Sequence, residues 1–83
     1  MKLEFKFKEG VRPKARRKLA ADLVDRGAHA VHPLFPGEKD PELGALYLVD
    51  CTSREKALQL LRMLQETEDV EFAEEGVSRR LVR

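Results

Sequence analysis

The chain has one cysteine, no tryptophan and almost no net charge, since 16 basic and 15 acidic residues give +1 at pH 7. A single cysteine excludes an internal disulfide. No apolar run approaches the roughly 18 residues that a membrane span needs. The balanced charge gives no bulk attraction to nucleic acid or to anionic lipid. Any partner must therefore be recognised by a local patch rather than by overall charge.

The sequence does contain enough apolar material for one small core. Its 83 residues are 42% hydrophobic and 37% charged, and this length allows a single domain. A disordered chain would be poorer in apolar residues. Residues 1–10 alternate charged and apolar side chains and lack the apolar segment of a signal peptide. We therefore expect a cytoplasmic protein, unless the chain is an excised propeptide of a secreted precursor.

The first part of the chain predicts a strand, a helix and a second strand. Charged residues alternate with the apolar set Leu3, Phe5 and Phe7, which is typical of a strand with one buried face. Pro13 suits a first helical position, and helical spacing of apolar residues over 13–26 ends at Gly27. Residues 29–34 predict a strand at a sheet edge, because Pro33 lacks a hydrogen-bond donor.

A loop over residues 36–44 leads to a third strand and a second helix. Residues 45–50 are apolar at both parities, which suits a central strand. Thr52 and Glu55 form a capping box, in which each side chain meets an unpaired backbone N–H at the helix start. The helix extends to about Glu66, and we expect it to bury Ala57, Leu60, Leu61 and Leu64.

A last strand over residues 70–74, with Val70 and Phe72 on one face, completes the order β-α-β-β-α-β. Right-handed crossovers place both helices on one face of a four-stranded antiparallel sheet. The predicted fold class is α+β, the ferredoxin-like plait, with the first and third strands central. Residues 1–76 would form this domain, and residues 77–83 would form an extended C-terminal tail.

The other face of such a sheet carries no helices. The third strand must present apolar residues there, because either Leu46 and Leu48 or Tyr47 and Val49 point outward. A short apolar stripe on an open sheet is a candidate docking surface. Self-association and cover by the loop over residues 36–44 stay open as alternatives.

No catalytic or metal-binding pattern is present in the sequence. His29, His32 and Cys51 occur without a C-x-x-C or H-x-x-x-H pair, and positions three apart on a strand face opposite ways. The following helix start could lower the pKa of the Cys51 thiol, but no histidine stands at a motif spacing from it. Both glycine-rich phosphate motifs are absent. We expect a binding protein, not an enzyme, with no metal and no cofactor.

Two charge clusters are candidates for binding a partner. A basic cluster opens the first helix, comprising Arg12, Lys14, Arg16, Arg17 and Lys18. It supports an alternative function, a ferredoxin-like RNA- or small-ligand-binding regulatory module, although Phe5 and Phe7 have the parity of core residues rather than of base-stacking ones. Acidic residues crowd the last strand, namely Glu66, Glu68, Asp69, Glu71, Glu74 and Glu75. Either they are simply solvated ahead of a frayed end, or they address positive helix ends of a partner that grips the tail as a strand.

Residues 45–82, ALYLVDCTSREKALQLLRMLQETEDVEFAEEGVSRRLV, resemble the second half of subtilisin propeptides of the inhibitor I9 type. That family has a strand, a Ser/Thr-capped helix, the pattern L-x-x-x-x-x-V-x-Y/F-V/A-E-E/P-D and a short tail. The matching positions are Leu64, Val70, Phe72, Ala73, Glu74 and Glu75. The first half matches in element order and in the join at Gly27. Gly76 departs from the pattern, since the family usually has Asp there.

The resemblance implies a propeptide-like inhibitor of a subtilisin-like serine protease, and a folding chaperone where such a domain is attached to its protease. Family members lay the open sheet face on two surface helices of the protease, while the C-terminal tail lies in the substrate cleft like a cleaved product. With Tyr47 and Val49 taken as the outward pair, the expected partner-binding residues are Tyr47, Val49, Glu74, Glu75, Arg80, Leu81, Val82 and Arg83. The resemblance assigns the capping of partner helices to Glu74 and Glu75. We expect neither a membrane nor a nucleic acid as partner. The sequence leaves open which protease is bound, which of the last three residues fills the specificity pocket, and the oligomeric state.

Overall fold

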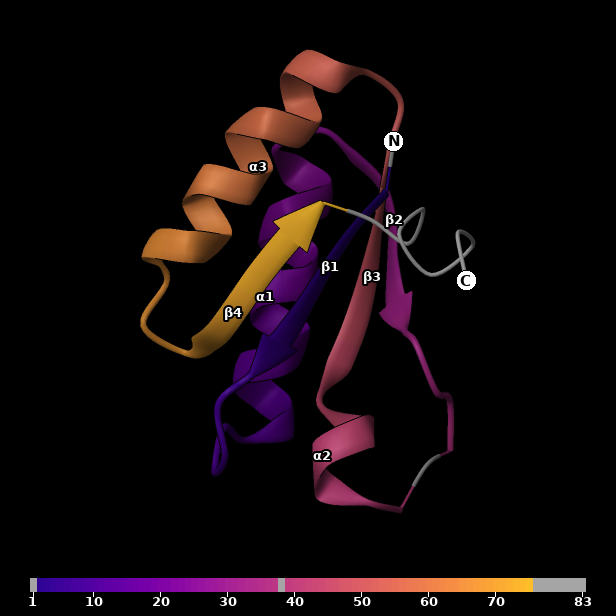
Figure 1. Ribbon diagram of the computed structural model, residues 1–83, viewed down its shortest axis with the longest axis vertical. Helices are drawn as coiled ribbons and strands as arrows, with labels where there is room; N and C mark the ends of the chain where they lie inside the picture. Colours follow the sequence, from indigo (N-terminus) through magenta and orange to yellow (C-terminus); the bar gives the residue numbers. More distant parts are fainter. Residues whose placement is uncertain (1, 38, 76–83) are drawn as a thin grey trace.

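The computed structural model describes residues 2–37 and 39–75 (Figure 1). Its elements are β1 (Lys2–Phe7), α1 (Pro13–Asp25), β2 (Ala28–Pro33), α2 (Pro41–Gly44), β3 (Leu46–Cys51), α3 (Arg54–Glu66) and β4 (Val70–Glu75). The order of the long elements is the predicted one. The predicted loop between the second and third strands differs from the expectation, because it contains one turn of helix, α2. The tail predicted for residues 77–83 lies outside the described residues.

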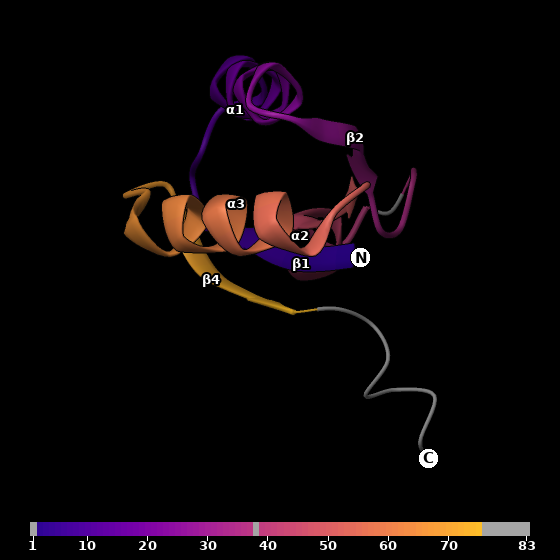
Figure 2. The same ribbon diagram turned by 90° about the horizontal axis from the view of Figure 1, so that it is seen from above.

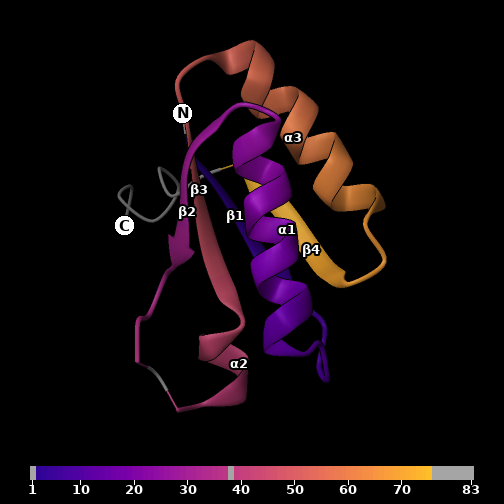
Figure 3. The same ribbon diagram turned by 180° about the vertical axis from the view of Figure 1, so that it is seen from behind.

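The four strands form one antiparallel sheet in the order β2-β3-β1-β4. The strands β1 and β3 are central, as predicted, and β2, which contains Pro33, lies at an edge. Figure 3 shows α1 and α3 in front of the strands, whereas Figure 1 is viewed toward the face that these helices leave uncovered. Figure 2 shows both helices lying to one side of β1 and β4. The fold is therefore an α+β, ferredoxin-like plait.

The core lies between the sheet and the two long helices. Leu3, Phe5 and Phe7 all point toward the helices and are buried. Phe5 stacks on Tyr47 with ring centroids 5.6 Å apart, and Phe7 meets both rings edge to face. Such aromatic pairs add to the free energy gained by burying their surface. The helices complete this core with Leu19, Leu23, Ala57, Leu60 and Leu64.

The helix α1 begins at Pro13 and ends one residue earlier than predicted, at Asp25. Gly27, which follows, has a φ of +117°, a conformation that a residue with a Cβ adopts only with strain. Val24, one of the apolar residues whose helical spacing predicted this helix, is exposed rather than buried. Among the described residues, no helix is both long and apolar enough to cross a bilayer.

The start of α3 differs from the prediction by one residue. The N-cap is Ser53, whose hydroxyl oxygen accepts a hydrogen bond from the backbone N–H of Lys56 at 3.2 Å. Thr52 was therefore the wrong cap, although Glu55 does lie in the first turn. Adjacent Thr and Ser residues are both good caps, and the strand β3, which extends to Cys51, decides between them by fixing where the helix can begin.

A pair of alanine substitutions separates the two caps. We expect Ser53→Ala to lower the free energy of unfolding by about 1 kcal/mol, because one backbone N–H at the helix start loses its acceptor. Thr52→Ala, on an exposed residue, should change it by less than about 0.5 kcal/mol. Urea unfolding measures both values. A larger loss for Thr52→Ala would contradict the observed capping.

Candidate functional site

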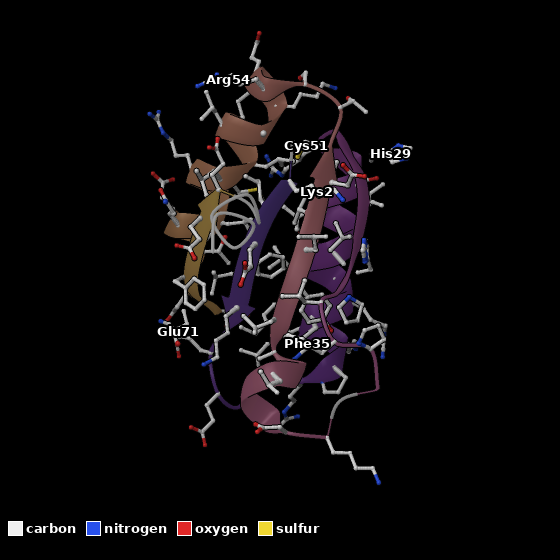
Figure 4. All side chains as sticks on the ribbon, turned by 45° about the vertical axis from the view of Figure 1, so that its right-hand side comes forward. Lys2, His29, Phe35, Cys51, Arg54 and Glu71 are labelled. Atoms are coloured by element: carbon white, nitrogen blue, oxygen red, sulfur yellow. The ribbon has the colours of Figure 1, made fainter. Side chains whose placement is uncertain are left out.

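The candidate site is the face of the sheet that α1 and α3 leave uncovered, which we call the open face. The strand register arranges its side chains in three rows: Ala30, Asp50 and Lys2; His32, Leu48, Glu4 and Glu74; and Leu46, Lys6 and Phe72. Figure 4 shows Lys2 and Cys51 at one end of the sheet and Glu71 at the other. The apolar members are concentrated in the middle and last rows, with charged side chains on the central strand β1 between them.

The two predicted interface residues on β3 point the other way. Tyr47 pairs with Phe5 and Val49 pairs with Leu3, so both lie on the face that packs against the helices. The expectation that Tyr47 and Val49 are the outward pair is therefore wrong, because both lie on the core side of the sheet. The alternative parity is the one observed, and it places Leu46 and Leu48 on the open face.

Phe72 also belongs to the open face, which corrects a second prediction. In β1, Lys6 pairs with Phe72 and the next residue, Phe7, pairs with Val70, so one extra residue, Glu71, is inserted in β4. Such a β-bulge reverses the facing of the residues beyond it. Val70 and Ala73 are buried, while Phe72 is 37% exposed. The two apolar residues predicted to share a face therefore lie on opposite faces.

The middle row contains two nearly inaccessible residues. Glu4 is 2% exposed and Leu48 is 8% exposed, and they lie opposite each other on the two central strands. On the other side, Glu4 pairs with Glu74 of β4. In the last row, Lys6 Nζ lies 3.3 Å from Glu71 Oε2. The centre of the open face is thus a carboxylate beside a leucine, with a second carboxylate next to it.

The acidic residues implicated by the resemblance lie at the end of β4. Glu74 is half-buried on the open face. Glu75, at the last position of the strand, is exposed but pairs with Leu3, so it lies on the helix side of the sheet. The other predicted partner-binding residues lie outside the described residues, namely Arg80, Leu81, Val82 and Arg83. The structure therefore places these two carboxylates at the last two described positions of the chain.

The basic cluster on α1 is partly engaged within the fold. The guanidinium of Arg16 lies 5.3 Å from the centre of the Phe7 ring and donates hydrogen bonds to the carbonyl oxygens of Val11 and Gly44, each at 3.3 Å. Arg16 therefore ties the start of α1 to the end of α2. The remaining members of the cluster are exposed: Arg12, Lys14, Arg17 and Lys18.

Neither histidine nor the cysteine takes part in a recognisable reactive group. His29 and His32 are both exposed on the edge strand. Within residues 2–37 and 39–75, no group of three or more His, Cys, Asp or Glu side chains could hold a metal ion. Cys51 is buried, and this burial raises the pKa of its thiol, with a smaller contribution from the negative charge of Asp50.

The raised pKa of Cys51 predicts a pH dependence of stability. Because the thiol holds its proton more tightly in the folded chain, its contribution is complete below the pKa of an unfolded thiol, about 8.5, and is lost as the pH rises through the folded-state pKa. We expect the stability difference between the wild type and Cys51→Ala to shrink between about pH 7 and about pH 10. Urea unfolding at both pH values measures it. A difference that stays constant would contradict the raised pKa.

Comparison of the chain with protein-family models, with curated proteins and with solved structures gave no match in any of the three. Any inference about the function of this protein therefore rests on its fold and on the residues of its open face.

Proposed function

We propose that this chain is a propeptide-like inhibitor of a subtilisin-like serine protease, which it binds through the open face while its C-terminal residues lie in the substrate cleft like a cleaved product. The observation that carries the proposal is the layout of that face. Leu46, Leu48 and Phe72 lie on the side of the sheet away from the helices, and the acidic end of β4 directly precedes residues 76–83.

The size of the open face supports a mode of binding that uses the tail as well. Four strands spaced about 4.8 Å apart, with six residues rising about 3.4 Å each, give a face of roughly 400 Å² in projection. Stable protein complexes bury about 800 Å² on each partner. The sheet alone would supply about half of this area. The tail, gripped along its length by a cleft, would supply the rest.

Glu74 and Glu75 are placed to add electrostatic attraction at the border of that contact. A carboxylate near the N-terminus of a partner helix accepts hydrogen bonds from unpaired N–H groups and interacts favourably with the helix dipole. Glu74 is half-buried on the open face and can contact a partner laid there. Glu75 pairs with Leu3 and so lies on the helix side of the sheet, but it is exposed at the end of β4, where a partner that extends around that end can reach it. These carboxylates would fix the position from which the tail enters the cleft.

Inhibition by this arrangement requires no covalent step. The backbone of the tail would pair with the edges of the protease cleft as an added strand, which supplies affinity, and the last side chains would supply selectivity. Slow dissociation of this product-like segment keeps the cleft occupied. The chain would also act as a folding chaperone where it is joined to its protease, since the same complementary surface is then present during folding.

The alternative function, RNA binding, has less support from the fold. Base stacking in this kind of sheet uses aromatic residues on the central strands. Phe5 and Phe7 of β1 are buried against Tyr47 on the helix side, and Phe72, the aromatic residue of the open face, lies on the edge strand β4. We therefore favour the protease over a nucleic acid as the partner.

The proposal is tested by titrating a subtilisin-like protease with the intact chain and with a chain that ends at Arg79. We expect the shortened chain to lose at least about 100-fold in inhibition, because the tail supplies a large share of the contact. Equal potency of the two chains would refute the product-like tail.

A second arm of the same titration examines the carboxylates. Glu74→Gln with Glu75→Gln should weaken inhibition about 10-fold, since two charge–dipole interactions are lost. The matched control, Glu66→Gln with Glu68→Gln, removes two exposed charges outside the open face and should leave inhibition unchanged. Equal effects of the two pairs would exclude a specific role for Glu74 and Glu75.

A further inference from the structure

Apolar side chains are concentrated at one end of the open face, the end at which α2 lies. The Leu34 N–H donates a hydrogen bond to the Leu46 carbonyl oxygen at 2.9 Å, which continues the pairing of β2 with β3 by one residue. Leu34 therefore joins Leu46 on the open face, in the row that ends with Phe72. The row at the other end contains the charged residues Lys2 and Asp50.

Two further apolar side chains lie beyond the sheet at the same end. Phe35, directly after Leu34, is 42% exposed, and Leu43 of α2 is 37% exposed. Figure 4 shows Phe35 at the α2 end of the sheet, away from Lys2 and Cys51. Neither Phe35 nor Leu43 packs against the core. We call this surface the apolar end, and its residues are Leu34, Phe35, Leu43, Leu46 and Phe72.

The apolar end contains most of the exposed apolar surface that the structure describes. Three of the five large hydrophobic residues that are exposed in residues 2–37 and 39–75 belong to it, whereas Val24 and Leu58 lie singly on the helices. Single exposed hydrophobic residues are ordinary, but a group of them marks an interaction site. The surface is therefore a candidate for contact with another molecule.

The connection that carries Leu43 is held in place within the fold. The Gly44 N–H donates to the carbonyl oxygen of Asp40 at 2.8 Å, and the guanidinium of Arg16 donates to the Gly44 carbonyl oxygen at 3.3 Å. The Phe7 N–H donates to the carbonyl oxygen of the next residue, Ala45, at 3.0 Å. Because Leu43 is fixed before a partner arrives, less conformational entropy is lost on docking.

The chemistry of this surface restricts what can cover it. None of its five residues is charged, and Lys6, which lies between Leu46 and Phe72, has an ion-pair partner in Glu71 at 3.3 Å. A charged group of a partner would lose its water here without gaining a counter-ion. The complementary surface is therefore apolar, and aromatic residues such as Phe35 are enriched at the buried centres of such contacts.

We propose that the apolar end is a second point of contact with the subtilisin-like protease, and that Phe35 and Leu43 meet an apolar part of the protease surface outside its substrate cleft. This inference rests on the proposed function and extends it. The open face offers roughly 400 Å² of the about 800 Å² that a stable complex buries on each partner, and Phe35 and Leu43 enlarge that contact beyond the sheet. Proteases with charged residues at the corresponding place would be rejected.

The double variant Phe35→Ser with Leu43→Ser tests the apolar end in the inhibition assay. We expect about 30-fold weaker inhibition through faster dissociation, because two apolar anchors are lost. The control, Val24→Ser with Leu58→Ser, removes two exposed apolar residues of the helix layer and should stay within about twofold. Circular dichroism and urea unfolding check that both are folded. The milder Phe35→Ala should weaken inhibition in the same direction.

The possible outcomes separate this inference from the proposed function. Full inhibition by the folded Phe35→Ser, Leu43→Ser variant would overturn the inference and leave the proposed function intact. Failure of the wild type to inhibit would refute the proposed function, and the inference with it. Sedimentation of the free chain at increasing concentration should show a monomer. A dimer that this variant abolishes and the control retains would mean that a second copy occupies the apolar end, which also overturns the inference.

Discussion

Replacing Phe5 by alanine is expected to lower the free energy of unfolding by about 3–5 kcal/mol, as for other large-to-small changes in packed cores. Phe5 is inaccessible to solvent at the centre of β1, where its ring contacts those of Phe7 and Tyr47. A domain of this size has a total stability of about 5–10 kcal/mol. The substitution should therefore leave a substantial unfolded population, which urea unfolding followed by circular dichroism would measure.

Phe72→Ala is the matched control for this experiment, because it removes the same ring from the open face. Phe72 is partly exposed, so we expect a loss of less than about 1.5 kcal/mol. Comparable losses for the two substitutions would contradict the observed facing of β1 and β4. A small loss for Phe5→Ala would show that the core does not lie where the structure places it.

Replacing Leu48 by arginine is expected to reduce inhibition of the protease by at least about 100-fold. Leu48 lies in the middle row of the open face, and an arginine there would replace an apolar contact with a longer, charged side chain that must be desolvated on docking. The inhibition constant measures the effect. Leu58→Arg, at an exposed leucine of α3, is the control and should leave inhibition within about twofold, since surface substitutions remote from a contact have little effect.

The free energies of unfolding of Leu48→Arg and Leu58→Arg need to be measured together with their inhibition constants, because Leu48 is buried in the free chain. Leu46→Arg provides a second variant at a less buried position of the same face, and it should weaken inhibition in the same direction. Full inhibition by folded Leu46→Arg and Leu48→Arg variants would rule out docking through the open face.

The fold could be predicted from the sequence because local patterns and topology agree. Alternation in residues 2–7, the helical spacing that ends at Gly27 and the proline of the edge strand each indicate one element. Once the order β-α-β-β-α-β is known, the right-handedness of the crossovers leaves few ways to arrange the strands and helices in space. The helical turn α2 was missed, since four residues carry too little periodicity to reveal it.

The details of the open face were less predictable, and each error has a specific physical cause. The third strand is apolar at both parities, so its pattern does not distinguish Tyr47 and Val49 from Leu46 and Leu48. Its facing is fixed by the register with Phe5 of β1. The bulge at Glu71 depends on how β4 pairs with β1, a long-range contact that the sequence of β4 alone does not encode. Without the bulge, Val70 and Phe72 would share a face, as alternation suggests.

The buried state of Glu4 had no signal in the sequence either. In the sequence, Glu4 is one of four charged residues that alternate with apolar ones, and this pattern predicts an exposed position. Its low exposure is apparent only in the folded sheet, where its neighbours on β3 and β4 are known. A glutamate directly opposite another glutamate is a pattern that becomes visible only with the register known.

Docking through the open face is tested most directly by cross-saturation in a complex with a subtilisin-like protease. The chain is deuterated and methyl-labelled, the protons of the protease are irradiated, and the intensity of each methyl signal is recorded. We expect Leu46 and Leu48 to lose intensity while Val24 and Leu58 keep theirs. Saturation of Val24 and Leu58 with none at Leu46 and Leu48 would place the partner on the helices and contradict docking through the sheet.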